Sequence, residues 1–99
     1  MAGSGPLAGV KVIELAHIMA GPVCGLMLAD MGADVIKGEK VPDGDDTRRM
    51  VPPAIAGESA AFMILNRNKR GIAINLKSPG GKAVLEKMLA TADVLIENY

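Results

Sequence analysis

Short apolar runs separated by helix-like segments form the main pattern along the chain. Four runs are brief, mostly apolar and bounded by glycine, proline or polar residues, which is typical of buried strands. These runs are residues 10–15, 33–37, 72–76 and 93–97. Two intervening segments, residues 22–31 and 79–92, repeat apolar side chains near helical spacing. The alternation predicts an α/β fold, with a Rossmann-like parallel sheet and crossover helices.

Residues at the ends of these segments predict where each helix begins and stops. Pro22 suits the first helical position, because its nitrogen carries no hydrogen that would lack a partner there, and Gly32 suits the position after the helix. Ser78 followed by Pro79 predicts the start of the last helix. Residues 58–65 predict a further short helix. The predicted helices thus occupy connections between successive strands.

Composition narrows the class of protein. Eleven basic and eleven acidic residues give a formal net charge of zero, which argues against a nucleic-acid binder. A single cysteine, Cys24, excludes an internal disulfide, and a single histidine, His17, argues against a zinc cluster. No apolar stretch reaches the roughly 18 residues of a membrane span. The first residues lack the features of a signal peptide, so we expect a cytoplasmic protein without a metal or a membrane partner.

The junction between the first strand and the first helix is a candidate ligand site. In open α/β sheets ligands bind beyond the carboxyl ends of the strands, and free N–H groups at a helix start favour an anion. Gly21 and Pro22 mark this junction, although such a dipeptide more often marks a tight turn with no ligand. Lys40, at the mouth of the sheet, is the better ligand candidate, whereas Lys37 equally fits a side chain lying along the sheet edge.

Other polar residues have simpler interpretations. The basic cluster of residues 66–70 could neutralise phosphates, but most surface charges are simply solvated. Residues 38–57 predict a long loop with a self-neutralising charged surface. Its charged residues include Asp43, Asp45, Asp46, Arg48 and Arg49. We expect Cys24 and most of the seven methionines to lie in the core, and His17 to form a structural hydrogen bond.

Several motifs, taken in order, resemble one family. The motifs lie in residues 7–14, 20–22, 28–37, 44–48, 66–70 and 92–98, and include Ala20-Gly21-Pro22 and Asn66-Arg67-Asn68-Lys69-Arg70. Together they are similar to the opening of the family III CoA-transferases, which include formyl-CoA and carnitine-CoA transferases and the alpha-methylacyl-CoA racemases. The resemblance spans residues 6–99. It implies that the chain is the N-terminal portion of a larger fold, in which two subunits interlock as a homodimer.

The resemblance also implies which residues contact coenzyme A. They are Met19, Ala20, Lys40, Ile74, Asn75, Leu76, Lys77, Asn98 and Tyr99. All of them lie at the carboxyl ends of predicted strands, where the pattern of the chain independently predicts a ligand. Lys40 and Lys77 are expected to hold the phosphate charge of the adenosine portion. His17, Arg67 and Arg70 are secondary candidates.

Three positions depart from the family's pattern. Met19 stands where the formyl-CoA transferases carry a polar amide, which argues against formyl or oxalyl specificity. Gly38 replaces a bulkier residue and is expected to loosen the end of the second strand. Lys40 replaces a common arginine, so a point charge takes the place of a bidentate fork.

The resemblance places the catalytic residues outside this chain. In the transferases an aspartate attacks the acyl-CoA thioester, and no aspartate of residues 1–99 matches it. The histidine and aspartate of the racemases are likewise expected beyond Tyr99. We therefore expect residues 1–9 to be flexible and residues 10–99 to form an incomplete CoA-binding subdomain. The parent enzyme would act on an acyl-CoA and a small carboxylic acid, and this chain alone would show no turnover.

Two alternatives stay open on the sequence alone. The chain could belong to a racemase, although His17 and residues 44–48 favour the transferase. It could instead be a non-catalytic module that binds CoA or a nucleotide. An incomplete subdomain predicts an exposed apolar edge, poor solubility and weak binding, because its partner elements are missing, whereas a standalone module predicts a soluble chain that folds cooperatively.

Overall fold

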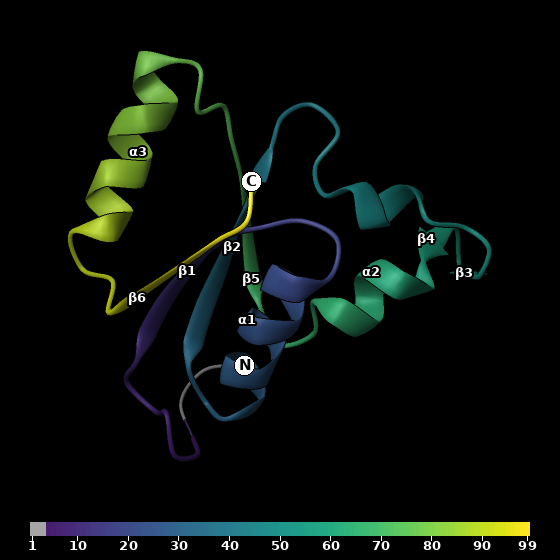
Figure 1. The fold of residues 1–99 in the computed structure, drawn as a ribbon, viewed down its shortest axis with the longest axis horizontal. Coiled ribbons are helices and arrows are strands. Elements are labelled where there is room, and N and C mark those ends of the chain that lie inside the picture. Colours follow the sequence, from purple (N-terminus) through teal and green to yellow (C-terminus); the bar gives the residue numbers. More distant parts are fainter. Residues whose placement is uncertain (1–3) are drawn as a thin grey trace.

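Four parallel strands make up the central sheet (Figure 1). The computed structural model describes residues 4–99 of the chain. In spatial order the strands are β5 (Arg70–Ile74), β2 (Asp34–Lys40), β1 (Lys11–Leu15) and β6 (Val94–Glu97). Every neighbouring pair is parallel, with helices in the connections between successive strands. This arrangement confirms the α/β class predicted from the sequence.

Helix α1 (Ala20–Asp30) lies across one face of the sheet (Figure 1). Its Ala29 packs with Val12 of β1 and Val35 of β2 in the buried core. The helix begins two residues before Pro22, which therefore occupies the third helical position and not the predicted first. Proline is still tolerated there, because no N–H in the first turn of a helix has an intrahelical partner.

The C-terminal end of α1 is hydrogen-bonded to the segment of residues 4–9. Gly32 follows the helix with a φ of +105°, a conformation that favours glycine, which confirms the predicted stop. Residues 4–9 form turns beside it, and the Leu7 N–H donates to the Met31 carbonyl oxygen at 2.9 Å. The segment predicted to be flexible is therefore hydrogen-bonded to the helix end in this part, while residues 1–3 lie outside the described residues.

Helix α3 (Pro79–Leu89) connects β5 to β6 and stands away from the sheet (Figure 1). The Ser78 hydroxyl accepts a hydrogen bond from the Gly81 N–H at 3.0 Å, as its predicted capping role requires. None of the residues of α3 is buried, and Val94 and Leu95 of β6 are 39% and 49% exposed. α3 and β6 therefore leave apolar side chains such as Val84 and Leu95 at the surface.

The methionines and the cysteine are more exposed than predicted. Five of the seven methionines lie at the surface: Met19, Met27, Met31, Met50 and Met63. Cys24 is exposed as well. The reason is that α1 packs on the sheet through small residues, chiefly Gly21, Gly25 and Ala29, so that its longer side chains point away. A close helix approach has therefore replaced the expected packing of large side chains.

Strand β2 is longer than predicted. It continues through Gly38 to Lys40, and Gly38 pairs in register with Ile72 of β5. Gly38 does not end the strand, because β5 supplies register partners for β2 as far as Lys40. β5 itself begins two residues earlier than the predicted segment of residues 72–76.

The rest of the predicted loop also carries structure. It contains a 3-10 helix, η1 (Asp46–Arg49), and a small hairpin of β3 (Ala54–Ile55) and β4 (Glu58–Ser59). The predicted short helix is α2 (Ala60–Leu65), which the Ser59 hydroxyl caps by accepting from the Phe62 N–H. No helix within residues 4–99 is long and apolar enough to cross a membrane.

Candidate functional site

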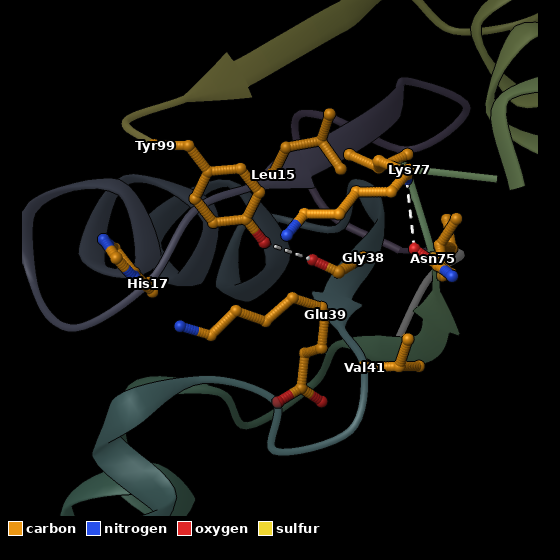
Figure 2. A pocket seen from close by; sticks show the side chains of 11 residues that line it. Leu15, His17, Gly38, Glu39, Val41, Asn75, Lys77 and Tyr99 are labelled. Carbon is orange, nitrogen blue, oxygen red and sulfur yellow. Dashed lines mark hydrogen bonds between the residues drawn. The ribbon is translucent and has the colours of Figure 1, made fainter.

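A cavity of about 420 Å³ opens at the carboxyl ends of β1, β2 and β5. Figure 2 shows its lining, with Tyr99 on one side and Glu39 and Val41 on the other. Seven of the residues proposed from the sequence line it: His17, Lys40, Ile74, Asn75, Leu76, Lys77 and Tyr99. The cavity therefore lies at the edge of the sheet where the sequence predicted a ligand.

Tyr99 forms one wall of this cavity. Its hydroxyl donates a hydrogen bond to the Gly38 carbonyl oxygen at 3.0 Å, which ties the segment after β6 to the middle strand β2 (Figure 2). The ring meets His17 edge-to-face, with ring centroids 5.3 Å apart. Burial raises the pKa of the Tyr99 phenol, and nearby carboxylates raise it further. Tyr99 is therefore a neutral wall and hydrogen-bond donor at neutral pH.

Two lysines bring positive charge to the rim. The Lys40 ammonium lies 3.4 Å from an oxygen of Asp46, and its side chain is half-exposed. Asp46 also pairs with Arg49 and lies 3.9 Å from His17 Nδ1. Lys77 is exposed, and among residues 4–99 its ammonium pairs with no carboxylate. The rim thus offers cations to an anionic ligand.

Asn98 has a role in the structure that the sequence did not reveal. Its side-chain oxygen accepts from the His17 N–H at 3.0 Å, and its Nδ2 donates to the His17 carbonyl oxygen at 3.1 Å. Both polar ends of the amide are therefore engaged in holding the turn between β1 and α1. Met19 and Ala20, at the start of α1, are exposed and do not line the cavity.

Arg67 and Arg70 lie elsewhere. Arg67 pairs with Asp30 at the end of α1, at 2.8 Å. Arg70 holds Asp34 through two hydrogen bonds of 3.0 and 2.7 Å. Because Asp34 and Arg70 begin β2 and β5, this pair sits at the amino ends of the parallel strands, away from the cavity. The structure does not bring these two secondary candidates to the site.

Beneath α1 lies a buried ionic network that sequence reasoning missed. Four charged side chains, each at most 2% exposed to solvent, pair in a row with alternating sign: Lys69, Glu14, Lys37 and Asp45. The three successive N–O distances are 2.7, 2.8 and 2.8 Å. Two cations and two anions balance, as burial of charge requires. The expected places of Lys37 at a sheet edge and of Asp45 on a loop surface are therefore wrong.

The network follows from strand register and from a glycine. Glu14 of β1 and Lys37 of β2 are register partners in the parallel pair, so their side chains lie on the same face. Side chains alternate along a strand, which puts Glu14 on the same side as Val12, beneath α1. Gly25 leaves the space, because a Cβ there would lie 1.9 Å from Glu14 Oε1. A charged residue in each of two apolar strands, facing a helical glycine, was the available signal.

Asp45 stays ionised in this setting. Burial alone raises the pKa of its carboxyl, but hydrogen bonds from Lys37, the Ile18 N–H and the Thr47 N–H outweigh burial and lower the pKa to about 2. Burial lowers the pKa of Lys69, and its pairing with Glu14 opposes this effect. Asp45 therefore keeps its negative charge throughout the neutral range and can hold its donors there.

A second cluster fixes the η1 side of the cavity. Glu39 accepts two hydrogen bonds from the Arg48 guanidinium, at 2.7 and 2.6 Å, and one from the Asp45 N–H at 2.9 Å. The guanidinium also stacks over the Phe62 ring, 3.8 Å from its centroid. Burial opposes ionisation of Glu39, yet Arg48 and the Asp45 N–H hold its pKa below the ordinary value. Its carboxylate is therefore structural, although Glu39 lines the cavity.

Comparisons with known proteins point to one family. The sequence model of the family described as CoA-transferase family III matches residues 7–99. A succinate–glutarate CoA-transferase from Agrobacterium fabrum is 51% identical over 100 residues, and the human succinyl-CoA:glutarate CoA-transferase is 45% identical over 94 residues. The crystal structure of a CAIB/BAIF family protein from Brucella suis matches with a TM-score of 0.89 and 46% identity.

These matches cover nearly all of this chain but little of each relative. They include 95%, 95% and 96% of the chain, against 25%, 22% and 26% of the Agrobacterium, human and Brucella proteins. The chain thus spans about a quarter of the length of the relatives it matches. The match to the Brucella structure agrees with the four-stranded parallel arrangement described above.

Proposed function

Since the chain belongs to CoA-transferase family III, we propose that it forms the CoA-binding part of an enzyme that moves CoA between an acyl-CoA and a carboxylic acid. The cavity at the carboxyl ends of β1, β2 and β5 carries this proposal. It combines apolar lining from Leu15, Val41 and Ile74 with the cations of Lys40 and Lys77 at its rim. A ligand with phosphates and a less polar body fits such a surface.

The attacking carboxylate of the proposed reaction comes from outside residues 1–99. Within residues 4–99, Glu39 is the one carboxylate that lines the cavity, and Arg48 holds both of its oxygens. Asp45 is likewise held by Lys37 and by backbone N–H groups. Neither is free to attack a thioester carbonyl. In the proposed sequence an aspartate attacks the acyl-CoA carbonyl and displaces the CoA thiolate, which gives a mixed anhydride. The thiolate then attacks the aspartyl carbonyl of the anhydride, releases the donor acid and leaves a CoA thioester on the enzyme. The acceptor carboxylate displaces the thiolate from this thioester to form a second anhydride, and attack of the thiolate on its acyl carbonyl gives the new acyl-CoA and frees the aspartate.

We propose short dicarboxylic acids as the acid substrates. The two relatives named above act on succinate and glutarate by their names. The transferase is favoured over the racemase by the same two relatives, and over a standalone binding module by the exposed apolar surface of β6.

Calorimetric titration of the full-length protein tests the binding role. CoA, 3′-dephospho-CoA and pantetheine are compared as ligands for the wild type, K40A, K77A and the control K82A. Lys82 is an exposed lysine of α3 that does not line the cavity, so K82A removes the same charge elsewhere. Loss of a charge-assisted contact to phosphate is expected to weaken CoA binding about tenfold in K40A and K77A and to leave pantetheine binding unchanged.

Two results would contradict the proposal. One is wild-type protein that fails to bind CoA at millimolar concentration. The other is K40A and K77A proteins that bind CoA as K82A does, which would remove the phosphates from this rim. Conversion of succinyl-CoA and glutarate to glutaryl-CoA and succinate, followed by chromatography, tests the proposed acids in the same preparations.

A further inference from the structure

The buried network anchors the turn between β1 and α1 at two points and the first turn of α1 at a third. Lys37 donates to the Ala16 carbonyl oxygen at 3.1 Å, Asp45 accepts from the Ile18 N–H at 2.9 Å, and Lys69 donates to the Pro22 carbonyl oxygen at 2.9 Å. The network therefore does more than neutralise its own charges. It fixes the path of the backbone at the point where His17 faces the cavity (Figure 2).

The middle anchor holds an unfavourable backbone conformation. Ile18 has a φ of +65°, in the left-handed region that a β-branched residue rarely adopts. Such a conformation persists only where surrounding contacts hold it. The carboxylate of Asp45 supplies that contact from outside the turn, 27 residues further along the chain. Asp45 is itself fixed by Lys37 and by the Thr47 N–H, so its oxygen is aimed before any ligand arrives.

We propose that Asp45 is a positioning residue, which holds the turn of residues 16–19 against the cavity through the Ile18 N–H and so preorganises the wall that a CoA ligand meets. This inference rests on the proposed function for the identity of the ligand. It does not place Asp45 in contact with the ligand, because Asp45 is buried and does not line the cavity. Without the anchor, the backbone at Ile18 relaxes toward ordinary conformations, while the turn keeps its contacts from Lys37 at Ala16 and from Asn98 at His17.

The test compares D45A with D43A in the full-length protein. Asp43 lies in the same segment but is exposed, so D43A controls for loss of an acidic side chain there. Calorimetric titration with CoA is expected to give a dissociation constant at least tenfold higher for D45A, at unchanged stoichiometry, and an unchanged value for D43A. A purely structural role predicts the opposite pattern, in which the folded fraction falls and the surviving protein binds CoA with wild-type affinity.

Ile18→Gly provides a rescue that a structural role would not show. Glycine adopts a positive φ at no steric cost, so the turn no longer depends on an outside anchor to the same degree. The D45A effect on the CoA dissociation constant is therefore expected to shrink to about threefold or less in the I18G background. An equal loss in both backgrounds would overturn the proposal. If D45A does not fold, K37M/D45A, which removes the opposed charges together, is titrated against K37M.

Hydrogen exchange separates this inference from the proposed function. The Ile18 amide is expected to be protected in wild type and in D43A, and to exchange at least tenfold faster in D45A, whether or not CoA binds. If wild type does not bind CoA but the Ile18 amide depends on Asp45, the proposed function fails and the anchor stands. If wild type binds CoA and the Ile18 amide exchanges equally in D45A, the anchor is wrong and the proposed function stands.

Discussion

Substitution of Gly25 by alanine is expected to destabilise the protein by forcing α1 away from the buried network. Gly25 lies on the buried face of α1, directly above Glu14. A Cβ at this position would lie 1.9 Å from Glu14 Oε1, 3.0 Å from Glu14 Cδ and 3.3 Å from Lys69 Cε. The first of these distances is far inside any normal contact, so either the helix or the carboxylate has to move.

The magnitude follows from what holds Glu14 in place. Its two oxygens pair with Lys69 and Lys37 at 2.7 and 2.8 Å, so the carboxylate cannot swing aside without losing one partner. Breaking a buried ion pair costs roughly 3–5 kcal/mol, and a helical alanine returns about 1 kcal/mol relative to glycine. The net expectation is a loss of roughly 2–4 kcal/mol in the free energy of unfolding.

Urea unfolding of the full-length protein, followed by far-UV circular dichroism, measures this loss. The matched control is Gly80→Ala in the first turn of α3, where an added Cβ meets nothing within 4 Å. There the same substitution is expected to be neutral or to stabilise by up to about 1 kcal/mol. Equal unfolding free energies for the two variants would refute the reasoning, because they would show that α1 yields to the extra carbon without cost.

Two further predictions concern the same network. Lys69→Met leaves one oxygen of Glu14 buried without a partner and is expected to lower the unfolding free energy by roughly 3–5 kcal/mol, whereas Lys82→Met on exposed α3 should change it by less than about 0.5 kcal/mol. Folding lowers the pKa of the Asp45 carboxyl from 3.8 to about 2. The ionised carboxylate therefore stabilises the folded protein by roughly 2 kcal/mol above pH 4, and this contribution is lost as the pH falls from about 4 to 2. Unfolding midpoints measured over that range should fall more steeply for wild type than for D45A, and parallel curves would contradict the assignment.

The fold was largely predictable because its signals are local. Short apolar runs, a glycine after α1 and a serine–proline pair at the start of α3 each act within a few residues of the element that they define. The predictions were wrong where contacts with residues distant in sequence determine the length of a strand or the buried face of a helix. β2 extends three residues beyond its apolar run, since β5 supplies partners as far as Lys40. α1 turns its glycines and Ala29 inward, because the helix sits too close to the sheet for longer side chains.

The cavity was predictable for a topological reason. Parallel strands end at one edge, so the residues that follow β1, β2, β5 and β6 converge there whatever the intervening segments do. Arg67 and Arg70 are also basic, but Arg67 precedes β5 and Arg70 begins it, so they pair with Asp30 and Asp34 instead. Position relative to a strand's direction, and not charge alone, decides which basic residues reach the site.

The buried network was only partly predictable, because a charged residue in each of two apolar strands points to Glu14 and Lys37 but not to their distant partners Lys69 and Asp45. Lys37 is buried opposite Glu14 in the parallel register, and Asp45 is buried where it pairs with Lys37. The same register that buries these charges also aims them at the backbone of the turn after β1. Hydrophobic side chains of equal volume could fill this space, but they could not hold Ile18 at a positive φ. A function of the turn beside the cavity therefore explains why charge is kept beneath the helix.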